Sequence, residues 1–410
     1  MLGVMTTREL DRLLAGLPPR PRVVVSGNAA TPWTLLHQVD AALESYVLHL
    51  LNPQPGVPDR PGVRLETPFV GPGARRSPRL SYLPVRLSTV PLLYASRLPP
   101  DVVLLHTSLP HDGTISLGTE VNVLPAAVEA VRRRGGLVIA QMDPAMPYVY
   151  GDGVMPLAWM DVTVEATDPP GCPVPPVVDD AALGVAENVA RRIGDGATLQ
   201  TGIGSIPDAV LSVLGERRGL RFWSEMISDG VLDLEKAGSL DPEAVITCSF
   251  LFGTPELYAW ADHNPRLRLR RTEVTNDPAL ISAHDSMVSV NTALQVDLYA
   301  QVNASRMRGR PHSGFGGQTD FIVGALHAPR GQAVIALRSW HPRADVSTIV
   351  PMVDEPVTSF QPSAVVTEQG TAELWGRSDR EQAAVLISEV AHPSVRGELC
   401  EEARALGLLD

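Results

Sequence analysis

Short apolar runs alternate with longer amphipathic stretches along most of the chain. Residues 22–25, 102–105 and 137–140 are brief aliphatic runs of the kind that buried strands contain. Residues 34–48 and 122–134 instead repeat apolar positions at helical spacing. Strands that alternate with helices predict an α/β protein whose mostly parallel sheets carry helices on both faces.

A proline-rich break divides the chain. Residues 168–176 read DPPGCPVPP, which cannot continue a helix or a central strand. We therefore expect an N-terminal α/β domain at 1–170, a linker at 171–180 and a C-terminal α/β domain at 181–410. Residues 23–36 (VVVSGNAATPWTLL) and 198–211 (TLQTGIGSIPDAVL) both predict a strand, a small-residue turn, a proline and a helix. This internal echo indicates two related halves.

Composition and charge exclude several classes of protein. The 410 residues are 44% hydrophobic and 20% charged, as in globular proteins, and the net charge of −12 argues against nucleic-acid or anionic-membrane binding. Cys172, Cys248 and Cys400 form no CxxC pair, and the histidines show no metal spacing. The early charges and the lack of a long apolar run predict neither a signal peptide nor a membrane span. We expect a cytoplasmic protein without a metal.

Glu225 is the most informative single residue. It ends the β-prone stretch RFWSE, and Asp229-Gly230 follows as a strong turn signal. A carboxylate near a strand end lies where α/β sheets present catalytic groups. An ordinary solvated glutamate is the more common case, so the assignment depends on other segments.

Two glycine-rich segments strengthen a functional interpretation. Residues 201–208 (TGIGSIPD) predict a strand-to-helix turn, where glycines admit a ligand and the helix N-terminus favours an anion. A tight βα turn without a ligand is the alternative. Pro207 occupies the third glycine position of GxGxxG, which excludes the dinucleotide fingerprint.

The second segment, residues 313–321 (SGFGGQTDF), contains Gly316 and Gly317. Their successive N–H groups could bind an oxyanion in acyl transfer, although a bulged or flexible loop would also explain them. Asn276 precedes Asp277-Pro278 and is expected to cap a helix. The sequence contains no GxSxG, GxxxxGK[ST] or HExxH, which disfavours serine α/β-hydrolases, P-loop enzymes and zinc proteases.

Together these motifs resemble the acetyl-CoA hydrolase/transferase family, and within it the 4-hydroxybutyrate and butyrate–acetate CoA-transferases. The resemblance is carried by WSEMISDGVLDL (223–234), TGIGSIPDAV (201–210) and SGFGGQTDF (313–321). SGNAATP (26–32), SLGTEVN (116–122) and VVTEQGTAELWGRS (365–378) extend it over nearly the whole chain in the expected order.

The resemblance implies a fold and a site. It predicts two similar open, mostly parallel α/β domains, like class I CoA-transferases, with the active site in the cleft between them. Glu225 would be the nucleophile, and CoA would be a substrate rather than a cofactor. A homodimer or higher homo-oligomer is expected. The remaining implied site residues bind an oxyanion or a carboxylate (Gly316, Gly317, Asn276, Asn28) or CoA (Gly202, Ile203, Gly204, Ser205, Ile206).

The implied reaction moves CoA from an acyl-CoA to a carboxylic acid through covalent intermediates on Glu225. A glutamate with a pKa of about 4.3 is already ionised at neutral pH and needs no dedicated base. An acyl-CoA hydrolase using the same glutamate and a non-catalytic acyl-CoA binding protein are the alternatives. Departures from the family pattern leave the acyl substrate open; they are Phe315, Thr319, Gln369 and Trp375.

Overall fold

The computed structural model describes residues 7–174, 177–357 and 359–410, and the chain groups into two compact units. The first unit comprises Met1–Pro173, Val245–Thr275 and His312–Gly316, and the second comprises Val174–Ala244, Asn276–Pro311 and Gly317–Asp410. The chain thus returns twice to the first unit. The domain boundaries expected from the sequence stay a prediction. Within the expected linker, residues 171–174 and 177–179 have no regular structure, and residues 175 and 176 lie outside the described residues.

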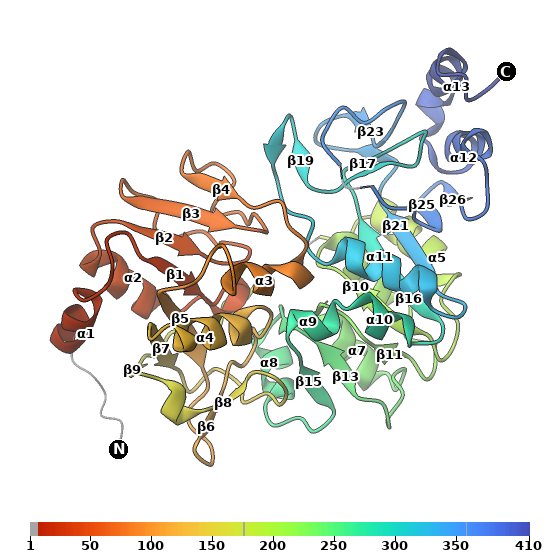
Figure 1. The fold of residues 1–410 in the computed structure, drawn as a ribbon. Helices are drawn as coiled ribbons and strands as arrows, with labels where there is room; N and C mark the ends of the chain where they lie inside the picture. Colours follow the sequence, from red (N-terminus) through yellow and green to blue (C-terminus); the bar gives the residue numbers. More distant parts are fainter. Residues whose placement is uncertain (1–6, 175–176, 358) are drawn as a thin grey trace. The chain divides into compact units, whose positions relative to one another are not determined.

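The first unit is built on a seven-stranded sheet that is parallel throughout (Figure 1). Its strands, in the order β4-β3-β2-β1-β5-β7-β9, are β4 (Leu80–Tyr82), β3 (Val63–Thr67), β2 (Tyr46–His49), β1 (Arg22–Val25), β5 (Val102–Thr107), β7 (Leu137–Met142) and β9 (Val162–Glu165). The three strands predicted from aliphatic runs are confirmed. Every residue of β5 is buried, which explains why residues 102–105 are apolar without alternation.

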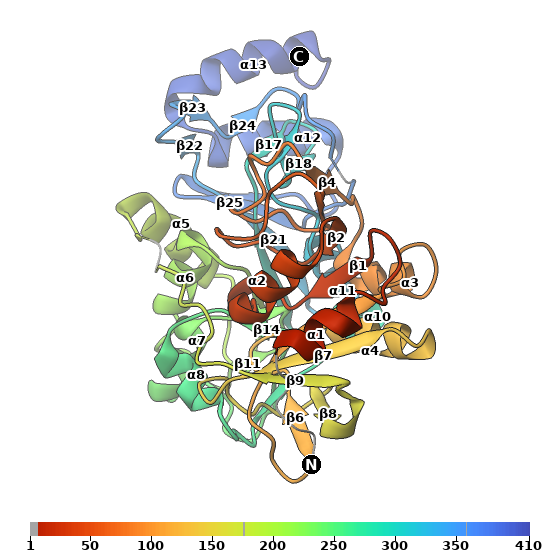
Figure 2. The same cartoon turned by 90° about the vertical axis from the view of Figure 1, so that its left-hand side faces the viewer.

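Helices cover both faces of this sheet. In both views α1 and α2 lie on one side of β1, and α3 and α4 lie on the other (Figures 1 and 2). The helices of the first unit are α1 (Thr7–Leu14), α2 (Trp33–Ala42), α3 (Val90–Tyr94), α4 (Leu124–Arg133), α8 (Pro255–Ala261) and α9 (Thr272–Thr275).

The helix predicted over residues 34–48 is too long. Helix α2 ends at Ala42, and residues 46–49 form the wholly buried strand β2. The reason is that the aromatic and β-branched pair Tyr46-Val47 suits a sheet, where pairing with β1 and β3 outweighs the helical spacing.

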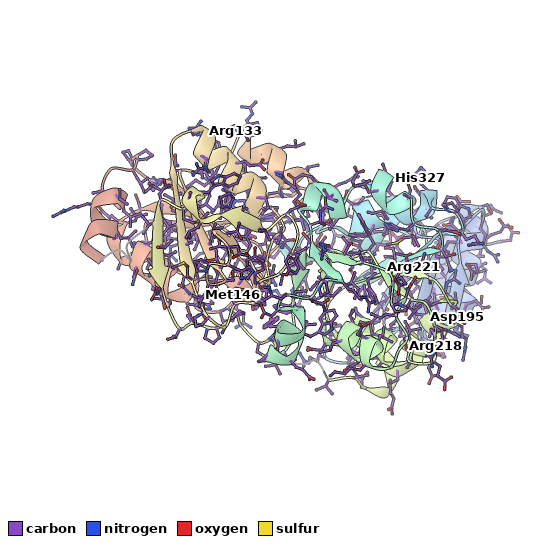
Figure 3. The ribbon with its side chains drawn as sticks, turned by 90° about the horizontal axis from the view of Figure 1, so that it is seen from below. Arg133, Met146, Asp195, Arg218, Arg221 and His327 are labelled. Atoms are coloured by element: carbon purple, nitrogen blue, oxygen red, sulfur yellow. The ribbon has the colours of Figure 1, made fainter. Side chains whose placement is uncertain are left out.

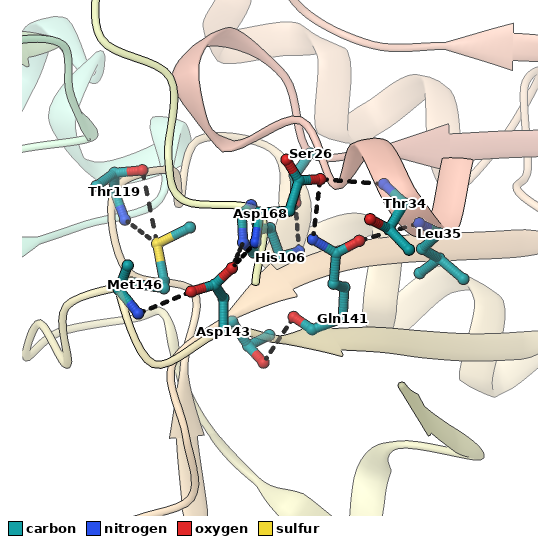
Figure 4. Close-up of polar contacts among 11 residues, drawn as sticks. Ser26, Thr34, Leu35, His106, Thr119, Gln141, Asp143, Met146 and Asp168 are labelled. Atoms are coloured by element: carbon teal, nitrogen blue, oxygen red, sulfur yellow. Dashed lines mark hydrogen bonds and ion pairs between the residues drawn. The ribbon is translucent and has the colours of Figure 1, made fainter. Parts of the chain in front are cut away.

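Side chains from elsewhere in the unit cap helix α2. Its N-cap, Pro32, offers no side-chain acceptor. Instead the backbone N–H of Thr34 donates to Asp168 Oδ2 at 3.0 Å, and that of Leu35 donates to Gln141 Oε1 at 3.0 Å (Figure 4). These bonds satisfy N–H groups that a helix start otherwise leaves unpaired, and they fix α2 to the carboxyl end of β7.

The second unit contains a six-stranded sheet that is parallel except for its last pair. Its strands, in order, are β11 (Arg221–Phe222), β10 (Thr198–Thr201), β16 (Met287–Thr292), β21 (Gln332–Ala336), β25 (Ala364–Thr367) and β26 (Gly370–Glu373). In both units the first strand lies between its successor and the later strands, so the strand order reverses there. Ligands of open α/β sheets bind at the carboxyl ends of strands at such a reversal.

The helices of the second unit pack on this sheet and on the apolar core around Phe321, Ile335 and Leu386. Arg218 donates its backbone N–H to Asp195 Oδ1 at 2.9 Å, which ties two loops together (Figure 3). The helices are α5 (Asp180–Ala190), α6 (Ser205–Ser212), α7 (Asp229–Lys236), α10 (Pro278–Ser282), α11 (Gln318–His327), α12 (Asp379–Val385) and α13 (Arg396–Ala405).

Short strands complete the two units. Those of the first unit are β6 (Thr114–Ser116), β8 (Val154–Pro156), β13 (Ile246–Cys248), β14 (Phe250–Leu251) and β15 (Leu267–Leu269). Those of the second are β12 (Met226–Ile227), β17 (Gln295–Asp297), β18 (Val302–Asn303), β19 (Arg306–Met307), β20 (Arg310–Pro311), β22 (Trp340–His341), β23 (Val346–Ser347) and β24 (Ile349–Val350). Every helix in the described residues is too short or too polar to span a bilayer.

Candidate active site

Glu225 lies in a bend of the second unit, between strands β11 and β12. The turn predicted at Asp229-Gly230 is wrong, because Asp229 is the first residue of helix α7. Gly230 serves packing instead: a Cβ there would lie 2.8 Å from the side chain of Leu211. The glycine therefore allows α7 to approach α6 closely.

Two predicted site residues meet the Glu225 carboxylate. Asn276 Nδ2 donates to Glu225 Oε2 at 2.8 Å. The backbone of Gly317 also bonds to Glu225. A Cβ at Gly317 would lie well under 3.0 Å from both Glu225 Oε2 and Asn276 Nδ2, closer than real Cβ contacts allow. Only glycine at position 317 permits this arrangement.

The surroundings of Glu225 disfavour its ionisation. Burial raises the pKa of Glu225, and the nearby charge of Asp320 raises it further, while the bonds from Asn276 and Gly317 act in the opposite direction; the resulting pKa is about 7. The pKa of Glu225 is therefore well above the ordinary value on which the expectation of full ionisation rests, and a part of the carboxyl groups is protonated at neutral pH.

Asn276 has a different role from the cap that its position suggested. The N-cap of α10 is Asp277, whose side chain accepts from the backbone N–H of Ala279 at 2.8 Å. Asn276 is fully buried, and its amide bonds to Glu225. The neighbouring aspartate explains the difference, because its carboxylate is an equally good cap one residue closer to the helix.

The predicted strand-to-helix turn is confirmed between β10 and α6, and it lies next to the segment of Glu225. Ser224 Oγ donates to the carbonyl oxygen of Thr201 at 3.2 Å. Of the five residues predicted to bind CoA, Gly202, Ile203 and Gly204 lie in the turn, and Ser205 and Ile206 are the first two residues of α6.

The backbone conformation requires a glycine at position 204 but not at position 202. Gly204 has φ +120°, which side chains rarely adopt. Gly202 has no such angle, and a Cβ there would meet nothing within 4 Å. Chain folding alone therefore does not explain Gly202, whereas close approach of a ligand to its backbone would.

Asn28 and Gly316 belong to the first unit. Asn28 is buried, and its Nδ2 donates to both carboxylate oxygens of Glu120, at 3.0 and 2.8 Å. Its Oδ1 accepts from Asn52 Nδ2 at 2.8 Å. The carbonyl oxygen of Gly316 accepts from the backbone N–H of Leu87 at 3.0 Å. The substrate contacts expected of Asn28 and the oxyanion contact expected of Gly316 stay predictions.

Sequence reasoning did not single out Asp320, whose charge acts on Glu225. The available signal was its place in SGFGGQTDF, three residues after Gly317. Across the described part of the chain, no group of three or more His, Cys, Asp and Glu side chains is arranged to hold a metal ion.

Comparison with known proteins decides the family. A 4-hydroxybutyrate coenzyme A transferase of Clostridium kluyveri is 35% identical over 416 aligned residues, covering 96% of each chain. The chain belongs to the acetyl-CoA hydrolase/transferase family. The model of that family's C-terminal domain matches residues 253–403. Acetyl-CoA hydrolases also match, over 48% of this chain.

Solved structures support the fold of this family member. RipA from Yersinia pestis superposes with a TM-score of 0.91 at 25% identity, covering 99% of this chain and all of that one. A 4-hydroxybutyrate CoA-transferase from Porphyromonas gingivalis superposes with a TM-score of 0.81 at 27% identity, covering 98% and 97%. The predicted α/β fold with mostly parallel sheets is confirmed. The chain is an enzyme of the CoA-transferase and acyl-CoA hydrolase kind.

Proposed function

We propose that the protein transfers CoA from an acyl-CoA to a carboxylic acid, with Glu225 as the covalent carrier. One observation carries the proposal. The Glu225 carboxylate accepts a hydrogen bond from Asn276 Nδ2 at 2.8 Å. It also lies so close to the backbone of Gly317 that position 317 has no room for a side chain. It is also next to a turn whose Gly202 backbone is open to a ligand.

The first half of the proposed reaction loads CoA onto the enzyme. An oxygen of ionised Glu225 attacks the thioester carbonyl carbon, the carbon–sulfur bond breaks, and CoA leaves as a thiolate from an acyl–glutamyl anhydride. The thiolate then attacks Cδ of Glu225 and displaces the acyl group as a carboxylate. The product is a Glu225–CoA thioester.

The second half runs these steps in reverse with another acid. Its carboxylate attacks Cδ of Glu225, CoA leaves as a thiolate, and a new anhydride forms. The thiolate attacks the acyl carbonyl of that anhydride, which releases the new acyl-CoA and restores the Glu225 carboxylate. The first acid leaves before the second acid attacks the Glu225–CoA thioester, so the kinetics are ping-pong.

The environment of Glu225 suits this role. With a pKa of about 7, the carboxylate is more basic than an ordinary glutamate yet still partly ionised at neutral pH. Greater basicity favours nucleophilic attack while the group stays ionised. The Gly317 N–H that bonds Glu225 is suited to stabilise the oxyanion formed at Cδ, an effect of roughly 3 kcal/mol per donor in other acyl-transfer enzymes. Gly316 would supply a second donor.

The substrates follow from the same proposal. CoA would lie against Gly202 to Ile206, where open backbone and the N-terminus of α6 suit an extended anionic ligand. Asn276 and Asn28 would hold the small carboxylic acid. A cytoplasmic homodimer or higher homo-oligomer completes the proposal, by analogy with the family alone.

Hydrolysis of acyl-CoA is the second candidate, and the matching acetyl-CoA hydrolases favour it. It would use the same glutamate, with water instead of an acid attacking the intermediate. A non-catalytic acyl-CoA binding protein agrees less well, because binding alone does not require a carboxylate held by both Asn276 and Gly317.

Isotope exchange tests the proposal. Wild-type enzyme should exchange radiolabelled acetate into acetyl-CoA, or butyrate into butyryl-CoA, without a second acid, because loading CoA onto the enzyme is reversible. Glu225→Gln should abolish exchange yet still bind CoA. Sustained loss of thioester without acceptor acid would favour hydrolysis. Unchanged exchange in Glu225→Gln would contradict the role of Glu225.

A further inference from the structure

Asp320 is a buried carboxylate that the reaction described above does not use. It lies in the first turn of α11, and the residue is only 2% exposed. Acidic side chains are rarely buried so completely. A purely structural role is available, because an acidic residue in the first turn stabilises the positive end of a helix.

The position of Asp320 relative to Gly317 brings it near Glu225. Gly317 is the N-cap of α11, and Asp320 is the third residue of the helix. From this position the side chain points back toward the N-terminal end of the helix, where Gly317 lies. That segment of backbone bonds to Glu225, whose pKa is raised by the charge of Asp320. The two carboxylates are therefore electrostatic neighbours.

Three described elements that pack against α11 add no charge near this pair. Of the elements that pack against α11, α10 (PALIS), β16 (MVSVNT) and β21 (QAVIA) contain no ionisable side chain. Asp277 caps α10, and Asp208 of α6 accepts from Ser228 Oγ at 3.2 Å. Asp229 starts α7. Among these acids, Asp320 is the one whose charge acts on Glu225.

We propose that Asp320 is a positioning residue that keeps Glu225 strongly nucleophilic, because its buried negative charge opposes charge on Glu225 and favours its transfer to the substrate. On attack, the charge of Glu225 moves to the thioester carbonyl oxygen and then to the CoA sulfur. Repulsion between the two carboxylates is relieved as this happens. The inference rests on the proposed function of Glu225 and assigns a residue that adds to its reactivity.

The pH dependence of the first half-reaction tests this role. CoA release from acyl-CoA should be followed in rapid mixing, per active site, from acidic to alkaline pH. In Asp320→Asn the acid limb should move to lower pH by about one unit, because a repelling charge is lost. The rate at high pH should fall about threefold, because a carboxylate that is less basic by one pKa unit attacks more slowly. Asp320→Ser is a second neutral variant and should move the acid limb in the same direction.

Asp297→Asn is the matched control. Asp297 is a second buried aspartate of this unit, 2% exposed, and accepts from the backbone N–H groups of Tyr299, Gln301 and Val353. Its replacement can reduce the amount of folded enzyme, but the acid limb should stay in place.

The possible results separate the two proposals. If the acid limb of both neutral Asp320 variants coincides with wild type while Glu225 still becomes loaded with CoA, Asp320 is structural and the inference is overturned. If Glu225→Gln keeps full activity, the proposed function itself fails. A lower active fraction at every pH with an unmoved midpoint also overturns the inference.

Discussion

Glu66 is a buried carboxylate of the first unit and Glu225 is a half-buried carboxylate of the second, and the two have opposite surroundings. The Glu66 side chain on β3 is 1% exposed and contacts two basic groups, Arg22 Nε at 3.0 Å and His49 Nδ1 at 2.9 Å. Glu225 instead meets a neutral amide, a backbone N–H and the like charge of Asp320.

Their pKa values diverge accordingly. Burial acts to raise the pKa of Glu66, but the bonds from His49 and Arg22 outweigh it and lower the pKa to about 2. Burial raises the pKa of Glu225 to about 7, and its neutral hydrogen-bond partners only moderate the effect. Burial alone therefore does not make a carboxylate reactive. The partners decide whether the charge is held in place or available for attack.

The largest expected effect is a difference in turnover between variants of the two glutamates. Glu225→Gln should lower turnover by roughly 10³-fold or more, because the amide cannot carry CoA through an anhydride. Glu66→Gln should leave turnover per folded molecule unchanged. Steady-state assays with several acyl-CoAs, normalised to folded protein, measure both. Comparable losses in the two variants would remove the distinction.

Gly317→Ala should have the next largest effect. The new Cβ would displace the Glu225 carboxylate or the Asn276 amide, and a displacement of about 1 Å can cost roughly a hundredfold in rate. Gly397→Ala in α13 is the control, because a Cβ there meets nothing within 4 Å. Turnover numbers for the two variants give the comparison. Equal activity of Gly317→Ala and wild type would mean that the close approach is not needed.

Glu66→Gln should cost about 3 kcal/mol of unfolding free energy, because it leaves the Arg22 and His49 partners without their carboxylate. The lowered pKa of Glu66 fixes the sign with pH. The contribution of Glu66 to the unfolding free energy is full at pH values above its ordinary pKa of 4.5, and it is lost as the pH falls through about 2. Denaturant unfolding should therefore show a difference from wild type that shrinks in strong acid. A difference that grows there would contradict the ion-pair account.

Asn276→Ala tests whether the hydrogen bond from Asn276 lowers the pKa of Glu225. Its bond lowers the pKa of Glu225, so its loss should move the acid limb of activity to higher pH by about one unit. Activity at pH 7 should fall about fivefold, because the ionised fraction of Glu225 falls from about one half to about one tenth. Asn188→Ala is the control, since that amide donates to the carbonyl oxygen of Thr367 at 2.8 Å. An acid limb that moves to lower pH would reverse the assigned sign.

The smallest expected effect is a gain of stability in Glu225→Gln. Because the pKa of Glu225 is raised, this side chain contributes fully to stability at pH values below its ordinary pKa of 4.5. The contribution is lost as the pH rises through about 7. The neutral amide should therefore stabilise the alkaline protein, on the order of 1 kcal/mol because the group is partly exposed. Unfolding at acidic and alkaline pH measures this; a loss at alkaline pH would contradict the raised pKa.

The sequence predicted the parallel architecture well, because the buried parallel strands β1, β5 and β7 each contain an uninterrupted apolar run, at residues 23–25, 102–105 and 137–140. It failed where tertiary packing overrides local signals. The apolar residues of strand β2 continue the helical spacing of the preceding helix α2. Gly230 allows two helices to pack closely and does not form a turn. No change in composition marks the return of residues 245–275 and 312–316 to the first unit.

The candidate site shows the same limit. Motifs predicted Glu225, Asn276 and Gly317, and the structure brings these three together. The raised pKa was not predictable, since it depends on burial and on Asp320, which lies 95 positions from Glu225 in the sequence. Such long-range electrostatics has no local sequence signature. The hydrogen bonds of the Asn28 amide with Glu120 and Asn52 were not predictable either, because they join residues far apart in the sequence.

The mass of the peptide that contains Glu225 tests the central claim most directly. Enzyme mixed with acetyl-CoA or butyryl-CoA, without an acceptor acid, should carry a CoA adduct on Glu225. The adduct should disappear when a carboxylic acid is added, and it should be absent from Glu225→Gln. Consumption of the thioester without any adduct on Glu225, or an adduct on another residue, would contradict the account.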